Sequence, residues 1–87
     1  MDPFDTVGWQ KFTDVCHGEF FHCAFQDRLI SECSGLQDVA WAVFYRMLDD
    51  SISWLHGSIP ALKGAVPAAL LSSGRANEVR SCLWRMP

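Results

Sequence analysis

Apolar residues recur along this chain at the spacing of amphipathic α-helices. The first such stretch follows a short polar start, with apolar residues at Trp9, Phe12, Val15 and Cys16. Positions three and four residues apart share one side of a helix, so this pattern predicts a first helix. Asp5 or Thr6 is expected to cap it by accepting hydrogen bonds from its first backbone amides. Gly18 is less favourable than alanine in a helix by about 1 kcal/mol, and either ends this helix or weakens it.

A second helix is predicted from Glu19 to Cys33. Its apolar side is a ladder of residues four apart: Phe21, Phe25, Leu29 and Cys33. Most charged and polar residues of the segment fall on the opposite side, as an amphipathic helix requires. Ser34-Gly35 is expected to end the helix, because glycine tolerates the left-handed conformation that closes many helices.

The segment 39–48 is the most apolar part of the chain, since Arg46 is its only charged residue. We expect it to lie in a third helix that begins near Leu36, ends near His56 and is stopped by Gly57. A helix of this composition is apolar on nearly every side, so the rest of the fold or a partner must cover it. A chain of 87 residues has little protein with which to surround such a helix, which favours association with another molecule.

The last third of the chain predicts two shorter helical stretches. Ser58 and Pro60 form a favourable helix start, and Gly64 and Pro67 then predict a short helix, a kink and a further turn that ends at Gly74. A C-terminal helix follows, with its apolar residues at Ala76, Val79, Leu83 and Met86. The sequence therefore predicts an all-α protein, a small bundle of four to five helices in a single domain that spans residues 1–87.

The composition is that of a globular protein, with 49% hydrophobic and 13% aromatic residues. The net charge of −3 is unevenly divided. Residues 1–57 hold nine acidic and three basic residues, whereas residues 58–87 hold one acidic and four basic residues. An acidic body argues against nucleic acid as a partner, because binding to phosphates depends on clustered Lys and Arg. Arg75, Arg80 and Arg85 are expected to form a solvated helix face.

The chain has four cysteines, at positions 16, 23, 33 and 82. No secretory signal is visible, so we expect reduced thiols and a cytoplasmic or nuclear protein. The alternative is a secreted peptide stapled by disulfides, if a signal has been removed from the chain. No membrane span is expected, because the most lipid-like run, residues 59–71, is 13 residues long and a helical span needs about 20.

Residues 16–23 contain a nearly symmetric set of metal-ligating side chains: Cys16, His17, His22 and Cys23. Zinc binds four such groups in a tetrahedral arrangement, and Cys33 or His56 is available to complete a set. The spacing differs from that of common zinc fingers, and on one straight helix Cys16 and Cys23 lie about 10 Å apart along the axis. A zinc-stabilised regulatory module therefore stays an alternative that needs a bend at Gly18. Otherwise we expect no cofactor, with the cysteines packed as small apolar residues and the histidines in solvent.

The sequence contains no recognised arrangement for catalysis. It has no Gly-x-Ser-x-Gly motif, no phosphate-binding glycine loop and no dinucleotide fingerprint. The adjacent Cys16 and His17 diverge by about 100° on a helix and cannot form a hydrogen-bonded dyad. Asp49 and Asp50 are expected to lie on a solvated helix edge. We therefore expect a protein that is not an enzyme.

The third predicted helix is better suited to binding in the groove of a partner than to catalysis. Trp41, Tyr45, Leu48 and Ile52 follow one another at i, i+4, i+7 and i+11, with Asp50 between the last two. This register resembles the BH3 motif of the Bcl-2 family of apoptosis regulators, in which four apolar anchors fill groove pockets and an aspartate pairs with an arginine. The resemblance implies that these four residues are anchors and that Asp50 is the charge partner. The chain departs from the motif at Asp49, where the family keeps a small residue, and at Tyr45, where it has leucine.

The same region also resembles the groove of a Bcl-2 protein, in the spacing of Asp49, Trp54 and Gly64-Ala65. Ser53-Trp54-Leu55-His56 stands where that family has Asn-Trp-Gly-Arg. The chain is shorter than a full Bcl-2 fold, and the resemblance covers a minor part of it. It implies an apoptosis regulator or a BH3-like groove binder as a further alternative.

The function we expect is non-catalytic protein–protein interaction through the apolar helix around residues 39–55. The predicted contact residues are Trp41, Phe44, Tyr45, Leu48, Asp50 and Ile52. Trp and Tyr dominate interface energies, because they bury a large area at a small cost in entropy. The partner is another protein or a second copy of the chain in a homodimer, where one patch is covered twice. The competing interpretation is that these aromatic residues form the domain's own core.

Overall fold

The computed structural model describes residues 6–86, which fold as a small all-α bundle, as the sequence predicts. In this part of the chain the α-helices are α1 (Thr6–Phe20), α2 (Gln26–Glu32), α3 (Gln37–Met47), α4 (Ser51–His56), α5 (Pro67–Ser72) and α6 (Ala76–Arg85). Two 3-10 turns, η1 (Leu48–Asp50) and η2 (Pro60–Leu62), come between them. α1 has 15 residues, and within residues 6–86 no helix is long and apolar enough to cross a membrane. The predicted cap residue Asp5 lies outside the described residues.

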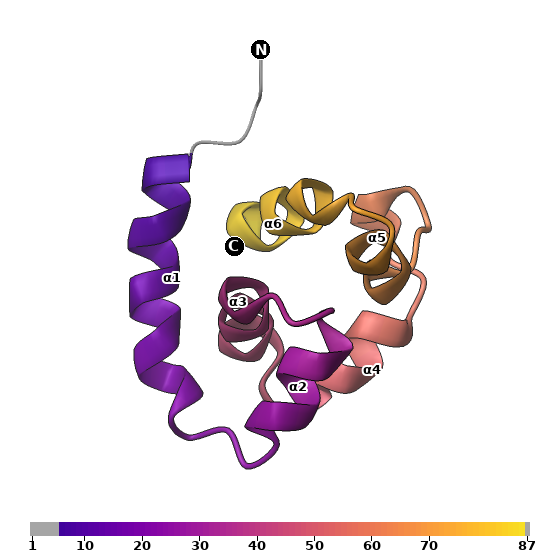
Figure 1. Ribbon diagram of the computed structural model, residues 1–87. Helices are drawn as coiled ribbons and strands as arrows, with labels where there is room; N and C mark the ends of the chain where they lie inside the picture. The colour runs from indigo at the N-terminus through magenta and orange to yellow at the C-terminus, as the bar shows by residue number, and fades with distance from the viewer. Residues whose placement is uncertain (1–5, 87) are drawn as a thin grey trace.

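α3 lies at the centre of the bundle. Figure 1 looks nearly along its axis and shows α1, α2, α4 and α6 arranged around it. Ala40 and Ala42 are fully buried, and side chains this small let neighbouring helices approach closely. The apolar segment 39–48 is therefore covered mostly by the protein's own helices, which limits the part of it that a partner can reach.

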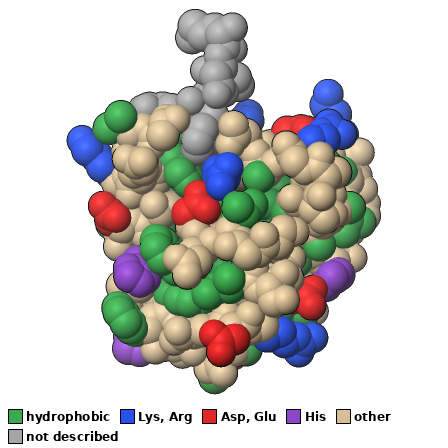
Figure 2. Space-filling model, in the orientation of Figure 1, with side chains coloured by type: hydrophobic (Ala, Val, Ile, Leu, Met, Phe, Trp, Pro, Cys, Tyr) green, Lys and Arg blue, Asp and Glu red, His purple; other side chains and the backbone are tan. Residues whose placement is uncertain are grey.

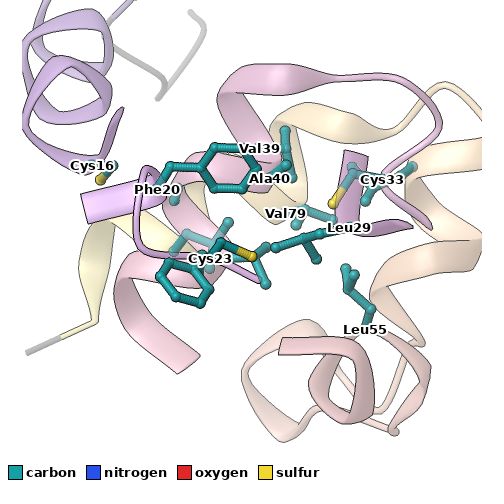
Figure 3. Packing of buried hydrophobic residues seen from close by; sticks show 14 of the residues in the cluster. Cys16, Phe20, Cys23, Leu29, Cys33, Val39, Ala40, Leu55 and Val79 are labelled. Atoms are coloured by element: carbon teal, nitrogen blue, oxygen red, sulfur yellow. The ribbon is translucent and has the colours of Figure 1, made fainter. Parts of the chain in front are cut away.

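The core receives side chains from every side of the bundle (Figure 3). α1 contributes Trp9, Thr13, Cys16 and Phe20, whose spacing of four, three and four residues keeps them on one side of the helix. The other helices contribute fully buried apolar residues: Leu29, Val39, Val43, Leu55, Val79 and Leu83. Full burial of each such side chain stabilises the fold by about 1.5–3 kcal/mol. The predicted apolar side of the last helix is the side that the fold buries, with Val79 and Leu83 fully buried. In the first helix Trp9 and Cys16 are buried as predicted, whereas Val15, predicted on the same side, is 60% exposed.

The boundary between the first two helices differs from the prediction. α1 continues through Gly18, because an exposed glycine with open space around it costs the helix only its low propensity. Phe20 takes the buried position at the end of α1, so its neighbour Phe21 points outward and is 73% exposed. The chain then turns, and α2 begins only at Gln26. The predicted ladder is therefore not one helix face, although its later members Leu29 and Cys33 are fully buried.

The predicted helix over residues 36–56 is interrupted at Leu48, the first residue of η1, which lies between α3 and α4. Leu48 has φ 51° and ψ −122°, a conformation that residues other than glycine adopt only with strain. The hydroxyl of the fully buried Ser51 donates to the Leu48 carbonyl at 2.6 Å and holds the turn. Leucine is a good helix former, so the local sequence does not predict this break.

The predicted ends at Gly35, Gly57 and Gly74 are confirmed. Gly35 follows α2 with φ 79°, and its amide donates to the Ile30 carbonyl at 2.9 Å. Gly57 ends α4, and Pro60 begins η2. Gly74 follows α5 with φ 80°, so the stretch after residue 58 consists of a short turn, a bend and one short helix, in the predicted order.

Candidate contact surface

The structure separates the six residues that the sequence predicts as a contact face. Phe44 is 5% exposed and belongs to the core, so it is a core residue rather than a contact residue. The others divide into half-buried residues, Trp41, Tyr45 and Ile52, and exposed residues, Leu48 and Asp50. The competing interpretation, that the aromatic residues of this segment form the core, therefore holds for Phe44 and in part for Trp41 and Tyr45.

Trp41 and Tyr45, the two partly exposed aromatic residues of α3, contact different residues of α1. Trp41 stacks on His17 with ring centroids 4.1 Å apart, whereas Tyr45 lies edge-on to Phe12 at 5.8 Å. Phe12 and His17 are five residues apart and so point to different sides of α1. The break at Leu48 lies between Tyr45 and Ile52, so the BH3-like register does not form one continuous helix face.

Arg46, the single charge of segment 39–48, is used inside the fold. Its guanidinium carbon lies 4.8 Å from the centroid of the Phe12 ring and 5.7 Å from that of the Tyr45 ring. Its Nε donates to the Leu83 carbonyl at 3.0 Å, and its Nη2 donates to the Trp84 carbonyl at 3.5 Å. Both carbonyls lie in the last turn of α6, where a positive charge is favoured by the helix dipole. Arg46 therefore holds α6 against α1 and α3.

Three rings from α1, the turn that follows it and α3 form a stack that we call the aromatic patch: His17, Phe21 and Trp41. The His17 ring stacks on both of the others, with centroid distances of 5.2 Å to Phe21 and 4.1 Å to Trp41 and interplanar angles of 29° and 21°. Phe21 is 73% exposed, more than any other large apolar side chain among residues 6–86. Figure 2 shows apolar and histidine side chains next to each other near the end of α1. The patch is therefore an ordered aromatic surface that water reaches.

A cleft with a volume of about 610 Å³ opens beside Trp41, between α1, α3 and α6. Its lining includes Trp9, Gln10, Asp14, Asp38, Trp41 and Arg80. Ligand sites typically combine aromatic walls with a few polar groups, in volumes of about 300–1,000 Å³. The cleft thus extends the aromatic patch into a surface that has both shape and polar groups.

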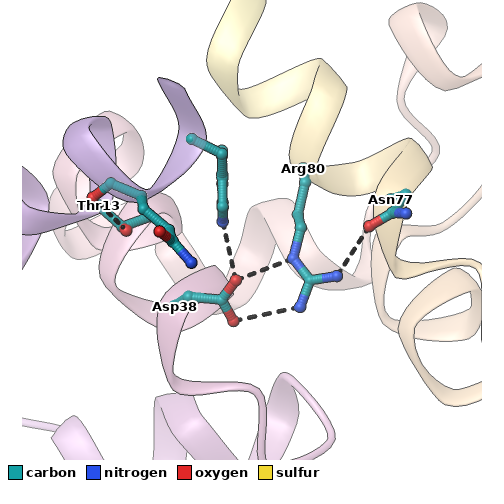
Figure 4. A network of polar contacts seen from close by, with 6 residues as sticks. Thr13, Asp38, Asn77 and Arg80 are labelled. Carbon is teal, nitrogen blue, oxygen red and sulfur yellow. Dashed lines mark hydrogen bonds and ion pairs between the residues drawn. The ribbon is translucent and has the colours of Figure 1, made fainter. Parts of the chain in front are cut away.

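Asp38 joins three helices at this cleft (Figure 4). Its Oδ2 accepts hydrogen bonds from Trp9 Nε1 at 2.8 Å and from Arg80 Nε at 2.9 Å. Its Oδ1 accepts a third from Arg80 Nη2 at 3.3 Å. Burial alone would raise the pKa of Asp38, but the hydrogen bonds from Arg80 and Trp9, with the charge of Arg80, outweigh it and lower the pKa below its usual 3.8. Asp38 is therefore ionised at neutral pH and holds α1, α3 and α6 together.

The three C-terminal arginines do not form one solvated face, which corrects the prediction for Arg80. The Arg80 side chain is 20% exposed, and besides Asp38 it binds the Asn77 side chain at 2.9 Å. Arg75 and Arg85 are exposed as predicted, Arg75 in an ion pair with Glu78 on the surface. The helical spacing of the three gives no sign of this difference, because the partner of Arg80 is on another helix.

The alternative zinc cluster is not assembled in the part of the chain that the structure describes. Cys16 and Cys23 are buried, whereas His17 and His22 are exposed. Among residues 6–86, no three His, Cys, Asp or Glu side chains are placed to hold a metal ion. All four thiols are unpaired, and burial raises the pKa of Cys16 to about 11 and that of Cys33 to about 12. These two thiols are therefore protonated at neutral pH and serve as small core residues.

The sequence gives no sign that the three residues of the aromatic patch lie together. It assigns Phe21 to a buried helix face and His17 to a metal set. No local signal separates the exposed Phe21 from the buried Phe20, because neighbouring helix residues can both be buried, as Leu70 and Leu71 are. The network around Asp38 joins residues 29 and 42 positions apart, and no local pattern points to it.

No family model matches the chain, and comparisons with curated proteins and with solved structures find no match.

Proposed function

We propose that this protein is a non-catalytic protein–protein interaction module, and that its contact surface is the aromatic patch with the cleft beside it. The observation that carries the proposal is the 73% exposure of Phe21 within an ordered ring stack. Single exposed apolar residues are common on protein surfaces, but this one continues through His17 and Trp41 into a cleft. Covering such a ring at an interface stabilises the complex by up to about 1.5–3 kcal/mol.

The patch is ordered before any partner arrives. His17 and Trp41 are held on α1 and α3, two helices that pack directly against each other. Fixing a mobile side chain at an interface costs about 0.5–1.5 kcal/mol, and rings that are already stacked avoid part of this cost. Aromatic residues of this kind are enriched among the residues that dominate binding energies. Pre-ordering therefore favours a binding role for the patch.

Three buried or partly buried titratable groups, Asp38, Cys16 and Cys33, also favour a binding role. The Asp38 carboxylate accepts hydrogen bonds from Trp9 and Arg80 that hold the helices together. The Cys16 and Cys33 thiols are protonated at neutral pH. Neither arrangement supplies an activated nucleophile or a free general base. A cytoplasmic or nuclear location is part of the same proposal, and the four unpaired thiols support it.

The proposed surface keeps Trp41 from the face that the sequence predicts and adds His17 and Phe21. Phe44 leaves the set, because it is a core residue. Leu48 is 54% exposed and lies beyond the end of α3, so it is a separate contact point in this proposal. The partner is another protein or a second copy of the chain.

Two matched surface variants test the proposal. Phe21→Ser removes the exposed ring of the patch, and Val15→Ser removes an apolar side chain that is 60% exposed elsewhere on α1. Quantitative affinity capture is run in parallel with light scattering, which reports self-association. We expect Phe21→Ser to lose the binding partner, or the dimer, and Val15→Ser to keep it. Equal binding by both variants and the wild type would rule out the aromatic patch as the contact surface.

A further inference from the structure

We infer that the cleft beside Trp41 receives an arginine side chain of the partner protein, an inference that rests on the proposed function. Its lining includes the partly exposed Trp41, which also stacks on His17, and the exposed Asp14. Asp14 is exposed, and within residues 6–86 no hydrogen bond or ion pair engages its carboxylate. Asp38, the other carboxylate of the cleft, is already bonded to Trp9 and Arg80. Asp14 is therefore the acceptor that remains for a ligand.

The charges of the cleft favour a cation. Arg80 and Asp38 lie in the lining as an ion pair with Nε and Oδ2 2.9 Å apart, so their charges compensate each other. Asp14 then leaves a net charge of −1 in the lining. Residues 1–57, which supply α1 and α3, have six more acidic than basic residues, whereas residues 58–87, which supply α6, have three more basic than acidic residues. The negative field at the cleft therefore comes from the α1 and α3 walls, where Asp14 lies.

Among cations, the guanidinium group of arginine matches these partners best. It is planar, so it stacks on an aromatic ring, and it donates two parallel hydrogen bonds to a carboxylate. A cation within about 6 Å of a tryptophan ring is also attracted by its π-electrons. The amide oxygen of Gln10, exposed in the same lining, offers one further acceptor. Lysine has no flat group and uses the Trp41 ring less well.

The arginine is expected to come from a different protein rather than from a symmetric second copy. A twofold contact centred on the cleft would bring the Asp14 carboxylates of both copies to the same surface. Like charges in that position repel and destabilise the contact. A basic segment, with an apolar residue for Phe21 beside its arginine, satisfies both the charge and the exposed ring.

N-acetyl-arginine methylamide is the probe that tests this inference, and N-acetyl-citrulline methylamide, which has nearly the same shape but no charge, is its control. Binding is followed by the indole NMR signal of Trp41 in the full-length protein, assigned with Trp41→Phe. We expect a saturable shift with the arginine probe and at least tenfold weaker binding of the citrulline probe. Asp14→Asn should weaken arginine binding at least tenfold, whereas Asp27→Asn, which removes an exposed charge on α2, should leave it within twofold.

Citrulline binding as strong as arginine binding, or arginine binding unchanged by Asp14→Asn, would overturn the inference. Both results leave the proposed function open to its own test, because the Phe21 and Val15 variants do not involve the charge. A wild-type dimer that the arginine probe dissociates would place the arginine on a second copy and overturn its assignment to a different protein. Because Asp14 is exposed, its replacement is expected to leave the circular dichroism spectrum unchanged.

Discussion

Replacing Asp38 with asparagine tests whether the polar network holds α1, α3 and α6 together. Asparagine keeps the shape of the side chain but removes the charge that pairs with Arg80. Hydrogen bonds to charged groups contribute about 1.5–3 kcal/mol, and breaking a buried ion pair costs about 3–5 kcal/mol. The side chains of Asp38 and Arg80 are 31% and 20% exposed, so solvent screens the pair in part. We therefore expect Asp38→Asn to lower the free energy of unfolding by about 2 kcal/mol.

Urea unfolding followed by tryptophan fluorescence measures this loss. Asp27→Asn is the matched control, because Asp27 and Asp38 are each the second residue of a helix and share its dipole effect. Asp27 is exposed and has no ion pair among the described residues, so its replacement should cost about 0.3–1 kcal/mol. In a double-mutant cycle with Arg80→Met, we expect a coupling energy of about 1 kcal/mol or more between Asp38 and Arg80.

The effect of Asp38 also depends on pH in a defined direction. Its pKa is lower in the folded than in the unfolded protein, so its stabilisation is complete above the unfolded pKa and is lost as the pH falls through the folded pKa. The difference between wild type and Asp38→Asn should therefore be largest near neutral pH and shrink below about pH 4. Equal losses for the two asparagine variants, or a difference that does not change with pH, would refute the role given to this network.

Three further predictions follow from the burial and backbone geometry. Phe44→Ala should lower the free energy of unfolding by about 3–5 kcal/mol in urea unfolding, because it empties a core position; a loss below about 1 kcal/mol would return Phe44 to the surface. Leu48→Gly should raise the free energy of unfolding by up to about 1 kcal/mol, because glycine adopts φ 51° without strain. A lower value in the same assay would mean that packing of the Leu48 side chain outweighs the strain. Cys16 and Cys33 should resist Ellman's reagent at pH 8 in the native protein, because burial raises the pKa of these thiols to about 11 and about 12. In denaturant all four thiols should react, since none is in a disulfide. Rapid labelling of Cys16 or Cys33 in the native protein would contradict their burial.

The helical fold follows from the sequence because local signals dominate it. Apolar spacing predicts the first and last helices, and glycines with φ near 80° end the turns where the sequence places them, as at Gly35 and Gly74. The all-α class and the small bundle were therefore predictable. The break at Leu48 was not, because leucine favours helices and the strained turn depends on tertiary contacts such as that of the buried Ser51.

The contact surface was less predictable than the fold. An apolar segment such as 39–48 indicates that something covers it, but not whether the cover is the protein itself or a partner. The structure shows that neighbouring helices cover most of it, including Phe44. His17 and Trp41 are 24 positions apart in the sequence, and their stacking depends on how α1 crosses α3. Such crossing geometry is set by the whole core, so no local pattern reveals it.

Site-specific photo-crosslinking tests the proposed contact surface most directly. A photoreactive p-benzoylphenylalanine replaces Phe21 in one protein and Val15 in another, and both positions are well exposed. We predict that illumination links a partner, or a second copy, to the protein labelled at position 21 and not to the one labelled at position 15. Crosslinks of equal yield at both positions, or crosslinks at position 15 alone, would contradict the assignment of the aromatic patch as the surface through which this protein acts.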